Sequence, residues 1–218
     1  MNNPNQYDTL LDIVKNRRSV RFFKSDPFPD EFIDKMIESA RWAPSGFHTQ
    51  PWEFVVVKQK DLKDKIVEAI KRPKLGGFSD APVFILLLCD WRTKVGLPPP
   101  VQSSETRVGN TVCSSLANAF LYLSLAASTL GLGSCWVSPS ALPEAQSKIK
   151  ELLHIPETLT IYDMLAVGYG ANPPKPKTVI RTTEELLHRD DSGQFRTDDE
   201  VQAYMEKTRT WCISAHKK

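Results

Sequence analysis

The segment from Thr106 to Leu130 constrains the fold of this 218-residue chain more than any other. Apolar residues recur along it at helical spacing, and small or apolar side chains cover most of the circumference: Val108, Val112, Leu116, Ala119, Phe120, Leu123, Ala126, Ala127 and Leu130. A helix that is apolar on nearly every side needs protein around it. We therefore predict a long central helix that packs against a sheet or against another subunit.

A second strong signal is the run 83–89, which is apolar at every position. Such a run is typical of a strand buried on both faces, so we expect it in the middle of a sheet covered by helices. Further strands are predicted at 54–57, 134–138 and 160–168, and further helices at 7–15, 30–43, 61–71, 144–153 and 201–211. The segment 91–104, with its three consecutive prolines, is predicted to be an irregular flap.

Size and charge exclude several classes of protein. The chain of 24.6 kDa fits one domain. With 28 Lys and Arg against 26 Asp and Glu, the net charge of +2 is too small to indicate nucleic acid or an anionic membrane as the main partner.

The four cysteines lack metal-ligand spacing, so no metal site is predicted. The apolar run 83–89 is far shorter than the roughly 20 residues that span a bilayer. Since the N-terminus also lacks a signal-peptide pattern, we expect a cytoplasmic protein.

The first candidate site is the basic cluster Arg17-Arg18-Ser19-Val20-Arg21. Three guanidiniums and a hydroxyl within five positions can surround a phosphate from several sides, because each guanidinium offers planar, permanently charged donors. The alternative is a solvated helix end, since basic residues favour the negative pole of a helix dipole. A third interpretation is an interaction protein whose arginines bind a phosphorylated or acidic partner.

A loop that follows the second predicted helix supports the phosphate interpretation. It contains Pro44-Ser45-Gly46 and then His48-Thr49-Gln50-Pro51. Glycine allows close approach of the backbone, and an amide and an imidazole supply hydrogen bonds to a flat heteroaromatic ring. The cluster and the loop together indicate a mononucleotide cofactor.

In four ordered blocks the chain resembles the nitroreductase family of flavoproteins, from about Leu10 to about Leu187. The blocks are Arg17 to Arg21; Ala43 to Gly46 with Gln50-Pro51-Trp52; Gly131-Leu132-Gly133 with Trp136-Val137-Ser138; and Val167 to Gly170 followed by Lys175, Lys177 and Arg181. The resemblance implies an α+β homodimer with a mixed, mainly antiparallel sheet, a long central helix and an extended C-terminal arm. We treat 1–218 as one domain, with a core over about 10–187 and an extension over 188–218.

The resemblance also implies the cofactor and its contacts. FMN would lie at the subunit interface, with Arg17, Arg18, Ser19 and Arg21 at its phosphate and ribityl chain and with added charge from Lys177 and Arg181. Pro44, Ser45, Gly46 and Gln50 would come from the partner subunit to cover the ring, and Trp136, Val137 and Ser138 would lie along its other side. His48 is a candidate substrate contact, although a histidine hydrogen-bonded within its own loop is the commoner case.

The chemistry implied by the resemblance is hydride transfer from NAD(P)H through FMN to a small acceptor, such as a nitroaromatic or a quinone, by a ping-pong mechanism. Flavin carries the reaction itself, so no catalytic side chain is predicted. The dinucleotide fingerprint is absent, because Gly131-Leu132-Gly133 lacks a third glycine and follows a helix, so NAD(P)H is expected only as a transient donor. The alternatives are FMN storage or sensing without NAD(P)H turnover, and a member specialised for dehalogenation or flavin fragmentation.

Overall fold

The computed structural model describes residues 4–70, 77–172, 180–189 and 195–215. The chain forms two compact units, Met1–Pro174 and Lys175–Lys218. The assignment of a single domain stays a prediction.

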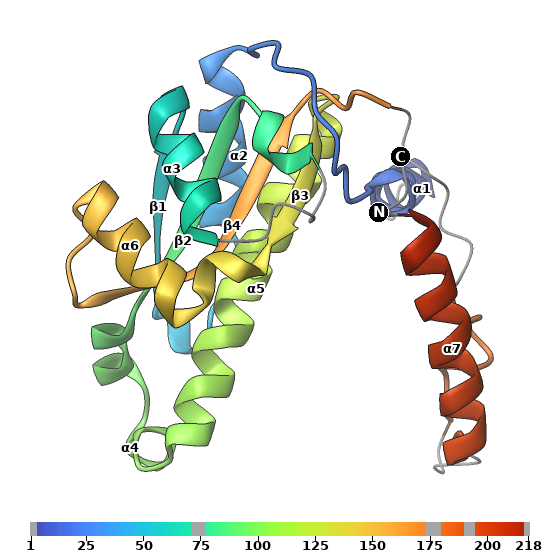
Figure 1. Ribbon diagram of the computed structural model, residues 1–218. Helices are drawn as coiled ribbons and strands as arrows, with labels where there is room; N and C mark the ends of the chain where they lie inside the picture. The colour runs from blue at the N-terminus through green and yellow to red at the C-terminus, as the bar shows by residue number, and fades with distance from the viewer. Residues whose placement is uncertain (1–3, 71–76, 173–179, 190–194, 216–218) are drawn as a thin grey trace. The chain divides into compact units, whose positions relative to one another are not determined.

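The first unit is built around a four-stranded sheet (Figure 1). Its strands are β1 (Trp52–Val57), β2 (Val83–Asp90), β3 (Gly133–Val137) and β4 (Leu159–Gly168), in the order β1-β2-β4-β3. All three strand pairs are antiparallel. A parallel pairing is present as an isolated bridge between Ser19, which precedes the sheet in the chain, and Ser134 of β3. As predicted, β2 is a central strand, and its first seven residues are buried.

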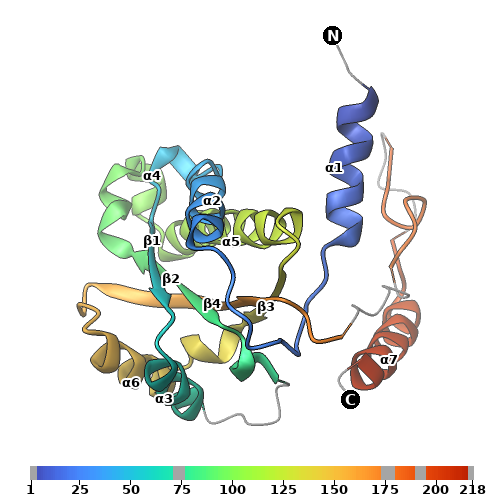
Figure 2. The ribbon, with the colours of Figure 1, turned by 90° about the horizontal axis from the view of Figure 1, so that it is seen from above.

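Helices cover both faces of the sheet (Figure 2). The helices of this unit are α1 (Pro4–Asn16), α2 (Asp30–Arg41), α3 (Lys60–Ile70), α4 (Pro99–Gln102), α5 (Glu105–Thr129) and α6 (Pro143–Leu153). Helices α2 and α5 share one core with Ile85, Leu87 and Leu165, whereas α3 and α6 share the other with Phe84 and Leu86. Alternate residues of β2 therefore serve opposite cores.

Helix α5 is the predicted central helix. By length and composition it could cross a membrane, but Val112, Leu116, Ala119, Phe120 and Leu123 are fully buried in the core that it shares with α2 and the sheet. The side chain of Ser104 caps its N-terminus by accepting a hydrogen bond from the N–H of Arg107. Its apolar composition is thus explained by burial within the protein.

The prediction of an irregular flap at 91–104 is wrong. This segment forms a 3-10 helix, Trp91–Gly96, followed by the short helix α4. Asp90 caps the 3-10 helix by accepting from the backbone N–H of Arg92 at 3.0 Å, and Gln102 Nε2 donates to the carbonyl of Leu97 at 2.5 Å. Proline fits the first turn of a helix, where no N–H is needed, so the prolines start α4 instead of preventing it.

The second unit contains α7 (Asp198–Ala215). Thr197 and Glu200 form a reciprocal capping box: the N–H of Thr197 donates to Glu200 Oε2 at 2.8 Å, and the N–H of Glu200 donates to Thr197 Oγ1 at 3.3 Å. The helix predicted at 201–211 is therefore present, and it begins three residues earlier than the apolar pattern indicates.

Candidate functional site

The basic cluster is positioned by the outer edge of β3. Directly after α1 the chain runs along this edge, where the N–H of Val20 donates to the carbonyl of Ser134 at 2.9 Å. The N–H of Lys24 donates to the carbonyl of Tyr169, just after β4, also at 2.9 Å. These bonds fasten residues 19–24 to the sheet, so the side chains around them project from a rigid support.

A pocket of about 430 Å³ lies beside this segment. Its lining comes from the end of α1, the end of α5, the start of β3 and the residues that follow β4. Arg17, Arg18 and Lys24 line it, and none of the lining residues described is acidic. Gly133 allows the close approach of the chain, because a Cβ there would overlap the side chain of Val20. The pocket, which we call the arginine pocket, therefore fits a small anion.

The two arginines of this pocket differ in what they already bind. Arg18 Nη1 donates to the carbonyls of Lys15 and Arg17, so it caps the end of α1. Within the described part of the chain, the Arg17 guanidinium has no hydrogen-bond acceptor and no acidic partner, although it is partly buried. Burial, followed by the charge of Arg18, lowers the pKa of Arg17. An anion in the pocket would offset both effects.

Ser19 and Arg21 lie on the same supported segment. Arg21 Nη1 donates to the carbonyl of Ser19 at 3.4 Å, a weak bond that leaves most of its donors available. Burial raises the pKa of the Cys135 thiol, and the charge of Arg21 opposes this rise. Arg21 therefore lies near β3, and Cys135 is a buried, protonated thiol without the features of a reactive one.

The loop 44–50 is held against residues 111–118 of α5. The N–H of Gly46 donates to Ser115 Oγ at 3.0 Å, and Asn118 Nδ2 donates to the carbonyl of Pro44 at 3.1 Å. Inside the loop, the N–H of Gln50 donates to Ser45 Oγ at 3.1 Å. The backbone and side chains of the predicted block are therefore ordered by two polar residues of a core helix.

Backbone strain marks this loop. Phe47, His48 and Gln50 have φ values of 53°, 57° and 43°, in the left-handed region that non-glycine residues seldom adopt. The side chains of His48 and Gln50 are joined by a hydrogen bond of 2.9 Å between Nε2 atoms. Such strain persists only where surrounding contacts hold it, and it is typical of ligand-binding loops.

Replacement of Gly46 tests the packing of this loop. A Cβ at position 46 would overlap the Cγ2 methyl of Thr111, so we expect Gly46→Ala to destabilise the protein by about 1–3 kcal/mol. Thr111→Ser removes that methyl, so the double variant should recover most of the loss. Urea unfolding of the wild type, the two single variants and the double variant gives the coupling energy between positions 46 and 111. Equal costs of Gly46→Ala in both backgrounds would contradict this packing.

The arginine pocket and the loop 44–50 do not meet within one chain. Ser115 holds the loop and Ser128 lines the pocket, and these residues lie in opposite halves of α5. A helix rises about 1.5 Å per residue, which separates them by roughly 20 Å. One subunit therefore offers two half-sites, one for an anion and one with amide and imidazole donors.

Trp136, Val137 and Ser138 continue along the edge strand from the arginine pocket. The Val137 side chain is buried in the core of α3 and α6, so only its backbone is available to a ligand. Ser138 is exposed. Trp136 is 42% exposed, and its ring lies 4.1 Å, centroid to centroid, from Phe120 of α5.

The structure adds a residue that the sequence pattern did not indicate, Asp163 of β4. Its Oδ2 accepts a hydrogen bond of 2.5 Å from Trp136 Nε1, and its side chain is buried. Burial raises the pKa of Asp163 to about 6, and the bond from Trp136 opposes the rise. An isolated carboxylate within an apolar strand has no motif to reveal it. Lys24 is also a single residue outside any motif, so the sequence pattern did not indicate it either.

Two predicted phosphate contacts, Arg181 and Lys177, do not belong to the described part of the first unit. Arg181 belongs to the second unit, where its Nη2 donates to the carbonyl of Glu185 and its Nε is buried without a hydrogen-bond partner among the described residues. Lys177 lies outside the described residues. Their assignment to the phosphate stays a prediction.

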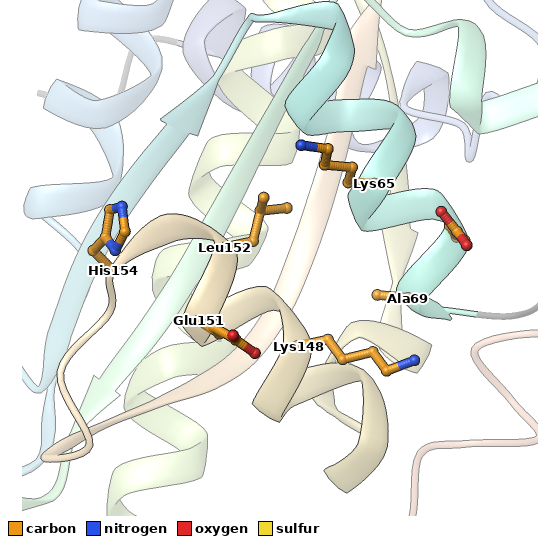
Figure 3. A pocket seen from close by; sticks show the side chains of 7 residues that line it. Lys65, Ala69, Lys148, Glu151, Leu152 and His154 are labelled. Atoms are coloured by element: carbon orange, nitrogen blue, oxygen red, sulfur yellow. The ribbon is translucent and has the colours of Figure 1, made fainter.

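A second pocket, of about 550 Å³, lies between α3 and α6 on the opposite side of the sheet from α5 (Figure 3). Lys65 and Lys148 line it together with Glu68 and Glu151, so its acidic and basic side chains are balanced. None of the predicted site residues lines it. Size alone would favour this pocket, but its chemistry selects no ligand, and we place the candidate site at the arginine pocket.

Comparison with known proteins identifies the family. The family model described as Nitroreductase family matches residues 14–169. A protein of Methanothermobacter thermautotrophicus, provisionally named NADH dehydrogenase/NAD(P)H nitroreductase, is 31% identical over 76% of this chain and 79% of its own length. The iodotyrosine deiodinase of Hydra vulgaris is 31% identical over 78% of this chain and 69% of its own.

A solved structure agrees with these similarities. The FMN-dependent nitroreductase of Clostridium difficile is 26% identical, with a TM-score of 0.66 over 83% of this chain and 99% of that one. The chain belongs to the nitroreductase family, which is FMN-dependent, and it is an oxidoreductase of that family. The resemblance and the α+β fold inferred from the sequence are confirmed.

Proposed function

We propose that the protein binds FMN in the arginine pocket and, as a cytoplasmic homodimer, reduces a small acceptor such as a nitroaromatic or a quinone with NAD(P)H by a ping-pong mechanism. The observation that carries this proposal is the partly buried Arg17, which has no partner within the described residues and shares its pocket with two more cations. Bound FMN would supply the redox chemistry by taking hydride from NAD(P)H and giving it to the acceptor.

The residues around the pocket fit a flavin phosphate. Arg17, Arg18 and Lys24 would hold the phosphate, while Ser19 and Arg21 would contact the ribityl chain. Gly133 lets the segment that carries these residues lie close to β3, because a Cβ there would overlap the side chain of Val20. Lys177 and Arg181 stay predicted phosphate contacts, on the resemblance alone.

Two copies of the chain would complete the site. Because the loop 44–50 and the arginine pocket lie at opposite halves of α5, one flavin would take its phosphate contacts from one subunit and its ring contacts from the partner. Pro44, Ser45 and Gly46 would cover the ring, and the Gln50 amide would orient it. A donor of this kind beside the pyrimidine edge would favour the anionic reduced state.

The visible spectrum of the purified protein tests the cofactor. We expect flavin absorbance, FMN on extraction, and loss of the absorbance on anaerobic addition of NADH or NADPH, with recovery on addition of menadione or nitrofurazone. A colourless protein that fails to bind added FMN would overturn the proposal. Bound FMN that neither nucleotide reduces would instead indicate storage or sensing.

Reductive dehalogenation is a second candidate, favoured by the similarity to iodotyrosine deiodinase over 78% of this chain. It uses the same proposed flavin site with a different acceptor. Iodotyrosine added to the dithionite-reduced protein separates the two: release of iodide with reoxidation of flavin supports dehalogenation, whereas turnover of nitrofurazone or menadione alone supports the first candidate.

Lys24 gives a test of the pocket that the sequence motif does not include. A single exposed cation near a phosphate contributes about 1 kcal/mol, so we expect Lys24→Ala to weaken FMN binding about three- to tenfold. The loss should shrink at high salt because the interaction is screened. Lys148→Ala, an exposed lysine of the other pocket, is the matched control. Titration of flavin fluorescence measures the FMN affinity of both variants. If Lys24→Ala binds FMN as tightly as Lys148→Ala and the wild type do, Lys24 does not belong to the site.

A further inference from the structure

Asp163 is a buried carboxylate with half of its hydrogen-bonding capacity unused. Its side chain is 8% exposed, and only Oδ2 accepts a hydrogen bond, from Trp136 Nε1 at 2.5 Å. Within the described part of the chain, Oδ1 is buried without any partner. A buried carboxylate costs free energy unless it is paired, so its presence here calls for an explanation.

A β-bulge places two consecutive residues, Tyr162 and Asp163, on the face of the sheet that α5 covers. Between β2 and β4 the register shifts, so that Leu87 pairs with Asp163 and Leu88 with Ile161, and Tyr162 is the extra residue. Tyr162 packs on the core of α5, and Asp163, on the same face as Leu165, reaches Trp136, whose ring lies against Phe120 of the same core. Regular alternation would send one of these two consecutive residues to the opposite face. Bulges that redirect a side chain occur often beside functional sites.

Three contacts fix the Trp136 indole. Its N–H is bound by Asp163, one side of its ring lies 4.1 Å from Phe120, and Tyr162 lies 6.3 Å away, all centroid distances for the rings. The residue nevertheless remains 42% exposed. It is therefore held on its inner side and presents a fixed aromatic surface on its outer side.

This surface continues the wall of the arginine pocket. Ser134 lines the pocket, and Trp136 follows it two residues later on the same edge strand and the same face. At about 3.3 Å per residue, the two lie roughly 7 Å apart along β3. A flat ring attached to an anion in the pocket and extended along this edge would meet the indole.

We propose that Asp163 is a positioning residue that holds the Trp136 indole in place as an aromatic wall for the flavin ring. This inference rests on the proposed function, since it assumes that the ligand of the arginine pocket carries a flavin. Asp163 does not touch the reacting atoms. It acts through Trp136, and an amide that still accepts the indole N–H should largely replace it.

The position of the indole should depend on pH, because a neutral carboxyl accepts a hydrogen bond less strongly than a carboxylate. The group bound directly to Asp163 is Trp136 of β3, and Tyr162 beside it on β4 faces the Cys113 thiol of α5. Burial raises the pKa of Tyr162, so it stays neutral at physiological pH. No cation is among the causes that set the pKa of Asp163, which is about 6.

Tryptophan fluorescence of the flavin-free protein tests this positioning. Five tryptophans are present, so the signal of Trp136 is taken as the difference between the wild type and Trp136→Phe. We expect this difference to change with an inflection near pH 6 and to become independent of pH in Asp163→Asn. A difference signal that is constant from pH 5 to 8 in the wild type would overturn the proposal.

Flavin binding provides the second readout. We expect Asp163→Leu to weaken FMN and riboflavin binding equally, by about three- to tenfold, and Asp163→Asn to bind both nearly as the wild type does. If Asp163→Leu does not fold, Trp136→Ala should show the same equal loss. Wild-type affinity for both flavins in Asp163→Leu or Trp136→Ala would overturn the proposal.

These outcomes are separable from a failure of the proposed function. If the wild-type protein binds no flavin, the proposed function fails, whatever the fluorescence shows. If it binds flavin but the Asp163 and Trp136 variants bind it normally, only the aromatic wall fails. Phosphate-site variants are a third pattern, because they should affect FMN and leave riboflavin unchanged.

Discussion

Arg17→Ala should weaken FMN binding about 100-fold while leaving riboflavin binding unchanged. Arg17 is partly buried and has no partner in the described part of the chain, so its donors are available for a phosphate. Two charge-assisted hydrogen bonds of about 1.5 kcal/mol each together correspond to a factor of about 100 in affinity. Riboflavin lacks the phosphate and should not sense the change. Isothermal titration of the flavin-free protein with each flavin measures the ratio.

Arg18→Ala is the matched control for Arg17→Ala, because it removes the same charge one position away. Arg18 Nη1 already donates to two carbonyls at the end of α1, so fewer of its donors remain for a ligand. We therefore expect a loss of FMN affinity several times smaller, together with a lower melting temperature from the lost cap. Equal losses of FMN affinity in the two variants would contradict the division of roles between these arginines.

The framework of the fold was predictable because its signals are long. The run 83–89 has no polar residue, and α5 has apolar side chains on nearly every face, so each could be assigned to the interior before any partner was known. The prediction for 91–104 is wrong because consecutive prolines suggest a break in the helix, whereas proline is compatible with the first turn of a helix. Short helical turns leave little periodicity to read.

The candidate site was predictable where it is a motif and not where it is a single residue. The arginine cluster and the loop 44–50 stand out by composition, and the structure places Arg17 and Arg18 at one pocket. Lys24 and Asp163 depend on tertiary placement: Lys24 reaches the pocket because its backbone is bound to Tyr169, and Asp163 of β4 meets Trp136 of the neighbouring strand β3. Neither contact leaves a sequence signal.

The second large effect concerns stability. We expect Asp163→Asn to stabilise the flavin-free protein at pH 8 and to lose that advantage at pH 4.5. Burial raises the pKa of Asp163 from 3.8 to about 6, so the folded state binds its proton more tightly than the unfolded state does. Stability from this group is therefore complete below pH 4 and is lost as the pH rises to about 6.

At pH 8 the ionised carboxylate costs about 3 kcal/mol, taking 1.36 kcal/mol for each pKa unit. Asparagine removes this charge and can still accept the indole N–H, although its own N–H groups need partners, so the expected net gain is about 1–2 kcal/mol. Urea unfolding from pH 4.5 to 8 at one protein concentration measures the difference. Its pH dependence should lie between pH 4 and 6. A difference that does not vary with pH would mean that Asp163 keeps one protonation state throughout this window. Its contact with Trp136 would then depend on a constant charge and not on the binding of a proton.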